Sequence, residues 1–355
     1  MNIKSSGFTV LTVPRLVRKV TPYIGCRGNG IPMAGTVPKG KLSGEELKEA
    51  LRGRKAKVVH LTHNDLDAAG SDAIHRLKYG EVFTIWASVG NYSFLLSALA
   101  EVKGGGDLLS ITDLGYQQGV ERWLKKARDA GWKVEWRDHH RWEDREADIV
   151  RPLVAHLSID TATCATGIAA RELAGGDTRA AEIARVVCDY DLWRNEDPRS
   201  TVLGRILSKP GLRDYVRDRL VEGTFIDPVI QKEYDGILAE MDQDIRKSIR
   251  HTKLFGERYR IAFSPLYGYP SDTASRVRGT FGSDIEVIVS RNGRFSIRSV
   301  PGISHLIARR FGGGGHPHAS GGAFPFTLVD RIAFVLFKKN HHFGDLVEVA
   351  ETIGE

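Results

Sequence analysis

The chain has 355 residues, of which 41% are hydrophobic and 27% are charged. This length is sufficient for two domains, and the composition is that of a globular protein, not of a fibrous or collagen-like one. No apolar run reaches the ~18 to 20 residues that a membrane-spanning helix needs, which excludes an integral membrane protein. Lysine and arginine outnumber aspartate and glutamate by 51 to 44. This excess, with a pI of about 9.2, favours an anionic partner such as a nucleic acid or a nucleotide.

The three cysteines, Cys26, Cys164 and Cys188, form an odd and widely spaced set. They are too few for the disulfide framework of a small secreted protein or for a four-cysteine zinc site. We therefore expect a reducing environment and a cytoplasmic location.

The first 54 residues are expected to form an N-terminal extension, because most of them lie in a basic stretch with proline and glycine. Its one clear element is a short helix over 43–51, for which Ser43 has the side chain of an N-cap. Since no acid precedes Glu45, a mitochondrial targeting peptide is one alternative, although no amphipathic stripe supports it. A disordered tail or a mis-assigned start before the second methionine, Met33, is another.

From Lys57 onward, short apolar runs alternate with segments of helical periodicity. This alternation is typical of βαβ units and predicts a parallel sheet with helices on both faces, that is, an α/β domain over residues 55–200. Ligands of such a sheet bind beyond the carboxyl ends of its strands. We expect strands at 58–61, 82–87, 108–112 and 134–136, and helices at 68–77, 93–102 and 117–130.

Residues 201–252 lack a strand pattern and place apolar residues on one helical face from Ile230 to Ile249. We expect a helical linker here, with a core helix of the first domain as the alternative. Strand-like runs then return at 259–263, 285–290 and 294–297, the last two separated by an Asn-Gly hairpin signal. Residues 253–355 are therefore expected to form a smaller α+β domain, with a helix after Phe326.

Acids and histidines directly follow three of the predicted strands. His63, Asp65 and Asp67 alternate after the first strand, so an extended chain would project them to one side. Each cluster taken alone also fits a polar turn or a helix cap. The other residues of this kind are Asp113 after the third strand and Asp138, His139 and His140 after the fourth.

A fourth acidic cluster follows an apolar helix that begins near Thr178. Asp189 and Asp191 compete here for a functional role, and the C-terminal region of a helix is the structural alternative. We favour Asp189 because it follows the apolar helix directly, and Asp191 is the second choice.

Together these clusters point to a metal site, because the carboxyl ends of parallel strands meet at one edge of a sheet. Carboxylates with two imidazoles and no thiolate suit Mn²⁺ or Mg²⁺ better than a thiolate-bound zinc. Two divalent ions would neutralise this many carboxylates.

A glycine run, 312–315, precedes His316, and a glycine pair follows at 321–322. A flexible linker would not normally contain His-Pro-His, so we interpret the run as backbone that approaches a ligand closely and binds phosphate through its N–H groups. The segment from Arg250 to Ser320 contains ten arginines and one lysine but only four acidic residues. This guanidinium-rich charge suits a phosphodiester, with a solvated basic face as the alternative.

With these motifs in order, the sequence resembles the DHH phosphoesterase superfamily, in the subgroup that joins a DHH domain to a DHHA1 domain. The stretch from His63 to Asp67 resembles the first motif, although many members place glycine immediately after its last aspartate. The stretch from Phe311 to His316, with Ala319-Ser-Gly, resembles the DHHA1 signature. The second, third and fourth motifs correspond to Asp113, to Asp138-His139-His140 and to Asp189.

The resemblance implies two-metal phosphoester hydrolysis. It implies that His63 and Asp65 hold one ion, that Asp67, His139 and Asp189 hold the other, and that Asp113 bridges them. His140 would contact the scissile phosphate, and Asp138 would orient its neighbours. The terminal phosphate of the substrate would be gripped by Arg298, Gly313, Gly314, Gly315 and His316.

We therefore expect a phosphodiesterase or exonuclease that uses two Mn²⁺ ions, with Mg²⁺ as the alternative, to degrade short single-stranded oligonucleotides. Alternatives of the same class are a RecJ-like single-strand DNA exonuclease and a phosphoesterase of 3′,5′-bisphosphate nucleotides or cyclic dinucleotides. A non-catalytic nucleic-acid-binding protein and a pyrophosphatase are less favoured. The expected partner is an oligonucleotide or nucleotide and not a membrane, and a homodimer is left open.

Overall fold

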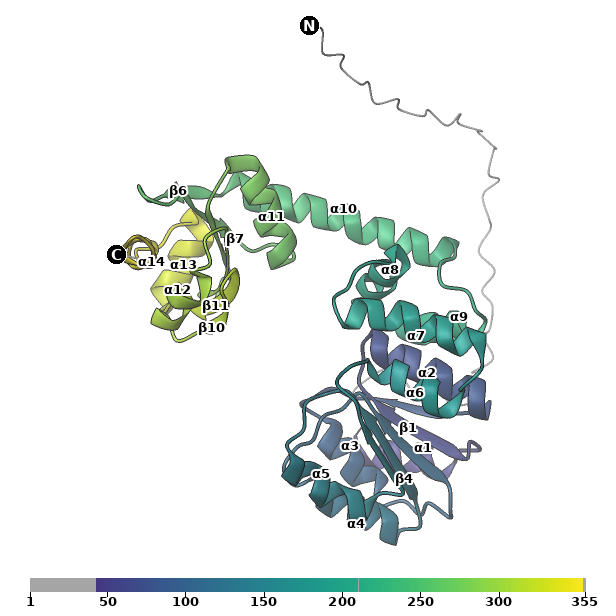
Figure 1. Cartoon of the computed structure of the whole chain (residues 1–355). Coiled ribbons are helices and arrows are strands. Elements are labelled where there is room, and N and C mark those ends of the chain that lie inside the picture. Colours follow the sequence, from purple (N-terminus) through teal and green to yellow (C-terminus); the bar gives the residue numbers. More distant parts are fainter. Residues whose placement is uncertain (1–42, 210, 354–355) are drawn as a thin grey trace, which may run out of the picture.

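The computed structural model describes residues 43–209 and 211–353, which form two lobes joined by the long helix α10, Pro228–Arg250 (Figure 1). Most of the expected N-terminal extension, including both alternatives for its origin, lies outside the described residues. The predicted helix α1, Gly44–Arg52, is present, and Ser43 caps it with a capping box that includes Glu46. The side chains of Leu47 and Leu51 are fully buried in the core of the first lobe.

The first lobe contains a five-stranded parallel sheet with the strand order β2-β1-β3-β4-β5. The predicted α/β class is thereby confirmed. The last strand was not predicted, because its half-buried sequence His-Leu-Ser-Ile lacks a clear apolar pattern. The strands are β1 (Val58–Thr62), β2 (Phe83–Trp86), β3 (Leu108–Thr112), β4 (Lys133–Asp138) and β5 (His156–Ile159).

Helices cover both faces of this sheet (Figure 1). One face packs its aliphatic side chains, such as Val59 and Leu109, against α1, α3 and α4. The other face carries α2, with α6 and α7 packed beyond it in a second apolar cluster. The helices of this lobe are α2 (Leu66–Tyr79), α3 (Tyr92–Leu99), α4 (Val120–Asp129), α5 (Asp144–Val150), the short η1 (Arg151–Leu153), α6 (Ala165–Leu173) and α7 (Thr178–Asp191).

A buried polar network fills the space between the sheet and α2. His60 Nδ1 lies 2.8 Å from Asp72 Oδ1, and His60 Nε2 lies 2.8 Å from the hydroxyl of Thr112. Burial opposes ionisation of Asp72, but the hydrogen bond with His60 and the charges of Arg76 and Arg217 hold its pKa well below the usual range. The network therefore ties α2 to the carboxyl ends of β1 and β3.

Two helices, α8 (Pro198–Ile206) and α9 (Leu212–Val221), lie in the region of the predicted helical linker and pack against the first lobe. Leu203 and Val216 are fully buried in its second apolar cluster. The N-terminal half of α10 joins the same cluster through Ile230 and Ile237, whereas its C-terminal end leads into the second lobe. The long helix thus serves both as a core helix and as the connection.

The second lobe contains a six-stranded mixed sheet with the order β10-β11-β9-β8-β7-β6, in which only β7 and β8 are parallel neighbours. The Asn-Gly signal is confirmed, because β8 and β9 pair as an antiparallel hairpin with Val289 opposite Phe295. The strands are β6 (Lys253–Phe255), β7 (Ile261–Pro265), β8 (Ile285–Val289), β9 (Arg294–Ser299), β10 (Gly314–His316) and β11 (Ala319–Ala323).

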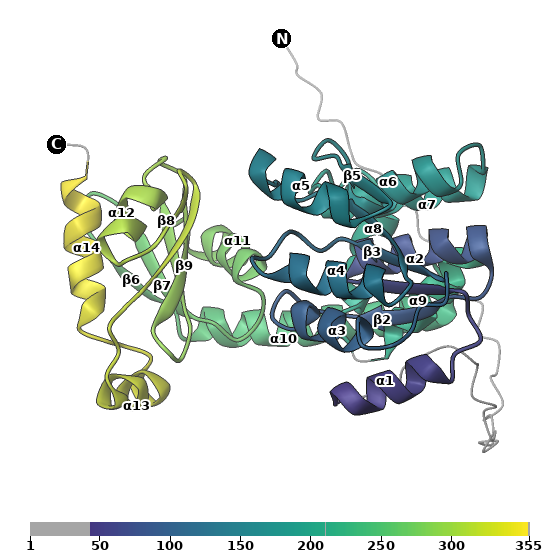
Figure 2. The same cartoon turned by 90° about the horizontal axis from the view of Figure 1, so that it is seen from below.

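Four helices accompany this sheet, and the segment after Phe326 forms two of them, not one. α14 lies on the outer side of the second lobe, away from the first (Figure 2). The helices are α11 (Pro270–Phe281), α12 (Ser304–Arg310), α13 (Leu328–Phe337) and α14 (His342–Thr352). Within the described ranges, no helix has both the length and the apolar composition needed to cross a membrane.

A disulfide joins Cys164, at the start of α6, to Cys188 in α7. The number and spacing of the cysteines gave no sign of this bond. The expected reducing, cytoplasmic setting therefore stays a prediction.

Candidate metal centre

The loop after β1 brings His63 and Asp65 together at the carboxyl edge of the sheet. Asp65 is the N-cap of α2, where one of its carboxylate oxygens accepts from the backbone N–H of Ala68 at 3.1 Å. The other oxygen lies 2.6 Å from His63 Nδ1. The same nitrogen lies 3.7 Å from Asp113 Oδ2. His63, Asp65 and Asp113 therefore offer donor atoms within 4.8 Å of one another.

Asp67 lies in the first turn of α2, is only 1% exposed and is held by the N-terminus of α6. Its two carboxylate oxygens accept from the backbone N–H groups of Ala165 and Thr166, each at 2.7 Å. Each oxygen keeps a further lone pair for a ligand. Burial, reinforced by the charges of Asp191 and Asp65, raises the pKa of Asp67 to about 8.

Asp113 follows β3 with a left-handed backbone, φ 54°, a conformation that non-glycine residues adopt rarely and often at functional sites. Its carboxylate is buried, with Oδ1 3.3 Å from His139 Nε2. Its Oδ2 has no hydrogen-bond partner among the described residues. Burial, together with the nearby charges of Asp67 and Asp65, raises the pKa of Asp113 well above its ordinary value.

His139 connects Asp113 to a second group of donors. Its Nε2 lies 3.7 Å from Asp67 Oδ2, and its Nδ1 lies 3.6 Å from Asp191 Oδ2. Asp67, His139 and Asp191 form a second set with donor atoms within 4.8 Å of one another. Asp191 Oδ2 is also buried without a hydrogen-bond partner in the described part of the chain. Burial raises the pKa of Asp191, although His139 opposes the shift.

The structure places Asp191, and not Asp189, in one of the donor sets. The carboxylate of Asp189 accepts from the backbone N–H of Glu196 at 2.9 Å, the backbone N–H of Asp197 at 3.1 Å and the hydroxyl of Ser200 at 2.5 Å. It thus fixes the turn between α7 and α8 and is in neither donor set. Because α7 continues to Asp191, the second choice from the sequence is the residue that reaches His139.

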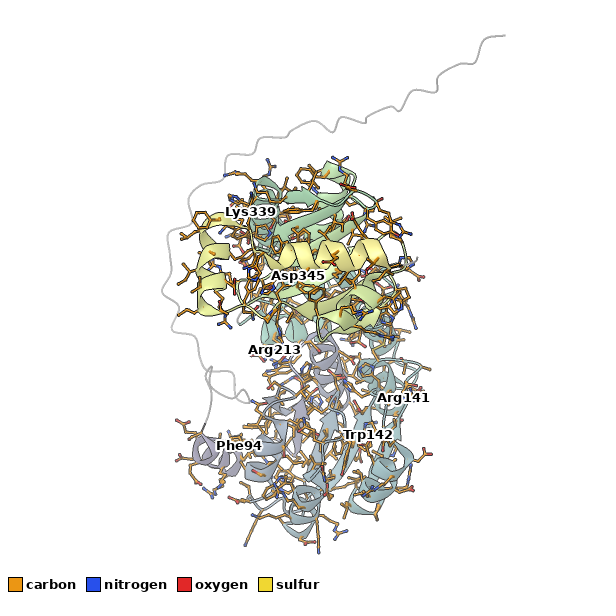
Figure 3. All side chains as sticks on the ribbon, turned by 90° about the vertical axis from the view of Figure 1, so that its left-hand side faces the viewer. Phe94, Arg141, Trp142, Arg213, Lys339 and Asp345 are labelled. Atoms are coloured by element: carbon orange, nitrogen blue, oxygen red, sulfur yellow. A yellow bond between two sulfur atoms is a disulfide. The ribbon has the colours of Figure 1, made fainter. Side chains whose placement is uncertain are left out.

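Asp138 lies beside the donor sets near the end of β4, and His140 shares a further set of donor atoms with Asp113 and His139. Asp138 is fully buried, with Oδ1 2.8 Å from His140 Nδ1, and its Oδ2 accepts from Trp142 Nε1 at 2.7 Å. The side chain of His140 is 48% exposed, and the hydrogen bond with Asp138 raises its pKa. Trp142 and the neighbouring Arg141 are labelled on the first lobe in Figure 3. Asp138 therefore orients His140 toward the solvent side of the centre.

These residues fit a pair of divalent cations. Four carboxylates lie among two imidazoles, and three of the carboxylates have raised pKa values, first because they are buried and also because other acids lie near them. Two buried carboxylate oxygens, on Asp113 and Asp191, lack a partner among the described residues. A cation in each donor set would supply those partners and remove the repulsion. Oxygen donors with imidazole nitrogens suit Mn²⁺ or Mg²⁺.

The second lobe presents Arg298 on β9, facing the N-terminus of α11. The guanidinium of Arg298 donates to the hydroxyl of Ser271 at 2.8 Å. The adjacent Asp272 accepts from Arg205 of α8 at 3.1 Å, so this part of the second lobe contacts the first. Arg298 therefore lies near the contact between the lobes.

The glycine run is part of a strand pair and is not a linker. Gly314, Gly315 and His316 form β10, antiparallel to β11. A Cβ on Gly313 would lie 1.9 Å from the backbone oxygen of Gly321, so close strand packing explains that glycine. The N–H of Gly313 donates to the oxygen of Ala308 at 2.9 Å and is not free for phosphate.

Comparison with known proteins now relates this geometry to a fold. No protein-family model matches the sequence, and no curated protein matches it significantly. Among solved structures, the pGpG-specific phosphodiesterase PggH from Vibrio cholerae is similar over 79% of this chain and 98% of its own, with a TM-score of 0.50 and 12% identity. The chain has the DHH/DHHA1 fold. The resemblance drawn from the motifs is confirmed at this level.

Two further similar structures have lower TM-scores. One is RecJ from Thermus thermophilus in complex with Mn²⁺. The match spans 87% of this chain and 54% of the RecJ chain, with a TM-score of 0.45 and 17% identity. The other is an exopolyphosphatase-related protein from Bacteroides fragilis. The match spans 86% of this chain and 94% of that protein, with a TM-score of 0.42 and 13% identity.

The DHH-type lobe also has a basic residue at the centre that the sequence did not indicate. Arg213 of α9 donates from Nε to the backbone oxygen of Asn64 at 3.0 Å, and its guanidinium lies 5.0 Å from the ring centroid of Trp86. Arg213 is among the residues labelled in Figure 3. The contact spans 149 residues, so no local pattern could have revealed it.

The metal-free protein should lose stability as the pH rises from about 5 to about 8. The pKa of Asp67 rises from 3.8 to about 8 on folding. Its contribution to stability is therefore complete below the lower value and is lost as the pH rises through the higher one. Urea unfolding in excess chelator at a series of pH values measures this. Asp67→Asn should weaken the dependence, and a stability that increases over this range would contradict the assignment.

Asp191→Ala should lower the number of divalent cations that the protein binds, whereas Asp189→Ala should leave that number unchanged. The second variant should instead lower the free energy of unfolding by about 1–3 kcal/mol, because three donors, two of them buried, lose their acceptor. Equilibrium dialysis gives the metal stoichiometry, and urea unfolding gives the stability. Loss of an ion from the Asp189 variant alone would restore the original preference.

Proposed function

We propose that this protein is a two-metal phosphoesterase that hydrolyses short single-stranded oligonucleotides. The observation that carries the proposal is the pair of donor sets at one sheet edge. His63, Asp65 and Asp113 form one, and Asp67, His139 and Asp191 form the other. Asp113 lies between them, since its two oxygens approach His63 and His139 separately.

The donor sets would hold two divalent ions, which lower the pKa of water and stabilise the attacking and leaving oxygens of an in-line displacement at phosphorus. The imidazoles of His63 and His139 favour Mn²⁺ over Mg²⁺, which prefers oxygen ligands and water. Asp65 and Asp67 are immobilised by the N-termini of α2 and α6, so the chain holds its ligands in place before any ion binds.

His140 would serve the scissile phosphate as a hydrogen-bond donor. Asp138 Oδ1 accepts a hydrogen bond from His140 Nδ1, which leaves His140 Nε2 for the substrate. The raised pKa of His140 favours its protonated ring. A cavity of about 180 Å³ adjoins His63, Asp113 and His140. Its position next to both the ligands and the donor suits a phosphoryl group.

The second lobe is suited to bind one end of the substrate, so that cleavage would occur at a fixed distance from that end. The guanidinium of Arg298 donates to two neutral oxygens, those of Ile297 and Ser271, and would exchange one of these bonds for a charge-assisted bond with an anion; it lies near the contact between the lobes. PggH, which shares the fold, is a pGpG-specific phosphodiesterase, and we extend this kind of substrate to this chain. A RecJ-like DNA exonuclease and a phosphoesterase of small nucleotides remain the alternatives within the same chemistry.

The purified protein should hydrolyse 5′-phosphorylated RNA dinucleotides and short oligomers when Mn²⁺ is present. Asp113→Ala should abolish turnover, and His140→Ala, which removes a hydrogen-bond donor to the phosphate, should lower kcat by about 10² to 10³. Arg298→Ala should chiefly raise KM. End-labelled RNA and DNA ladders, bisphosphate nucleotides and cyclic dinucleotides as competing substrates identify the preferred class. Full activity of Asp113→Ala in excess chelator would contradict the two-metal assignment.

A further inference from the structure

Trp193 has an unusual setting two residues after the metal-centre residue Asp191. Its side chain is 80% exposed, and its backbone is left-handed, with φ 56°. Asn195 repeats the left-handed conformation, with φ 54°. A large aromatic side chain in such a conformation is uncommon, and its exposure has no packing explanation within the described residues. Strained backbone of this kind concentrates at ligand sites.

The loop that carries Trp193 is fixed by hydrogen bonds. The backbone oxygen of Asp189 accepts from the N–H groups of Arg194 at 3.0 Å and Asn195 at 3.3 Å. The N–H of Trp193 donates to the oxygen of Tyr190 at 3.1 Å, and Asn195 Nδ2 donates to the oxygen of Trp193 at 3.1 Å. The indole is therefore presented from an ordered turn, so binding a ligand on it requires little further ordering.

Tyr190 places this loop between the metal centre and the second lobe. The rings of Tyr190 and Trp193 are nearly parallel, with 6.4 Å between their centroids. Tyr190 packs over Gly204 of α8, where a Cβ would lie 2.2 Å from its ring. The residue after Gly204 is Arg205, whose guanidinium lies 3.1 Å from Asp272 of α11 in the second lobe.

A continuous path thus leads from the metal ligands to Arg298. It runs from Asp191 past Trp193 and Tyr190 to the ion pair between Arg205 and Asp272, and then to the contact between Ser271 and Arg298. A bound oligonucleotide with its scissile phosphate at Asp191 would have its adjacent base near the indole.

We propose that Trp193 is the platform on which a nucleobase of the substrate stacks while the neighbouring phosphate lies at the metal centre. This inference rests on the proposed function. It specifies which part of the substrate the protein recognises, namely the π face of a base. Since every base has such a face, the platform would select nucleotides over other phosphoesters without selecting a sequence.

The test compares a 5′-phosphorylated diadenylate with a dinucleotide analogue of the same sugar-phosphate backbone that lacks both bases. Trp193→Ala should lower the ratio of kcat/KM for the diadenylate to that for the base-free analogue by roughly ten- to a hundredfold, through KM. Trp193→Phe should recover most of the loss. Phe94→Ala, which removes an aromatic side chain 52% exposed on α3 of the same lobe, serves as the matched control and should leave the ratio unchanged.

An unchanged ratio for Trp193→Ala would overturn the platform. If the wild-type protein hydrolyses neither substrate with Mn²⁺, the proposed function fails, and binding alone then decides the platform. For that measurement, diadenylate should quench the tryptophan fluorescence of the wild-type protein but not that of Trp193→Phe. Equal quenching in both proteins would reject the stacking.

A second, independent observation concerns α13 at the edge of the second lobe (Figure 2). Its apolar side chains are 41% to 73% exposed at five positions that share one face of the helix, and Phe337 at its end is 68% exposed. Only Phe334 of this helix is buried. The five positions are Leu328, Val329, Ile332, Val335 and Leu336.

The size of this stripe matches half of a dimer interface. The exposed apolar surface amounts to roughly 600 Å² per copy, at the upper end for a monomer and close to the ~800 Å² per partner of a stable interface. A stripe without charge on a short helix can pack against its own copy about a two-fold axis. The geometry points to a homodimer in which two α13 helices pack antiparallel.

Light scattering after size-exclusion chromatography should give a dimer mass for the full chain at micromolar concentration. Ile332→Glu should give a monomer with an unchanged circular dichroism spectrum. Val300→Glu, at an exposed apolar residue of the same lobe outside the stripe, should remain a dimer. A monomeric wild-type protein at about 100 µM, well above the dissociation constant of a stable dimer, or a dimer that survives Ile332→Glu, would overturn the proposal.

Discussion

Mutual repulsion among buried carboxylates at one edge of a parallel sheet is the constraint on which the rest of the structure depends. Asp67, Asp113 and Asp191 all have raised pKa values, because each is withdrawn from water and lies near another acid. Removing one of these charges would relieve the repulsion in the metal-free fold. The chain instead keeps all three together, which is favourable only when cations complete the cluster.

The fold stabilises this unfavourable arrangement through hydrogen bonds between the carboxylate-bearing segments and the elements packed against them. The amides at the start of α6 bind both oxygens of Asp67, and the pair of His60 and Asp72 ties α2 to β3 immediately before Asp113. These contacts are fully buried, so they are strong and leave the ligands little freedom to separate. The buried polar contacts between the sheet and α2 and between α2 and α6 thus keep the carboxylates together at the edge of the sheet.

Ligands that depend on local sequence could be predicted, and those that depend on helix phase or on distant contacts could not. The residues after β1, β3 and β4 follow apolar runs, and a parallel sheet necessarily gathers such positions at one edge. Asp189 and Asp191 are two residues apart on α7, so their side chains point in nearly opposite directions. Which one faces the sheet depends on the packing of α7 against α2, which no local pattern shows. The contact between Arg213 and Asn64 is hidden for the same reason, since it joins segments 149 residues apart.

The end of α7 shows how one short segment can serve three purposes. Cys188 and Asp189 face the protein, where the disulfide and the turn to α8 fix the end of the helix. Asp191 faces the sheet and His139. Trp193 then faces solvent, because the left-handed backbone turns the chain out of the helical path. The structural anchor, the proposed metal ligand and the exposed ring are therefore held at fixed spacing within one short segment.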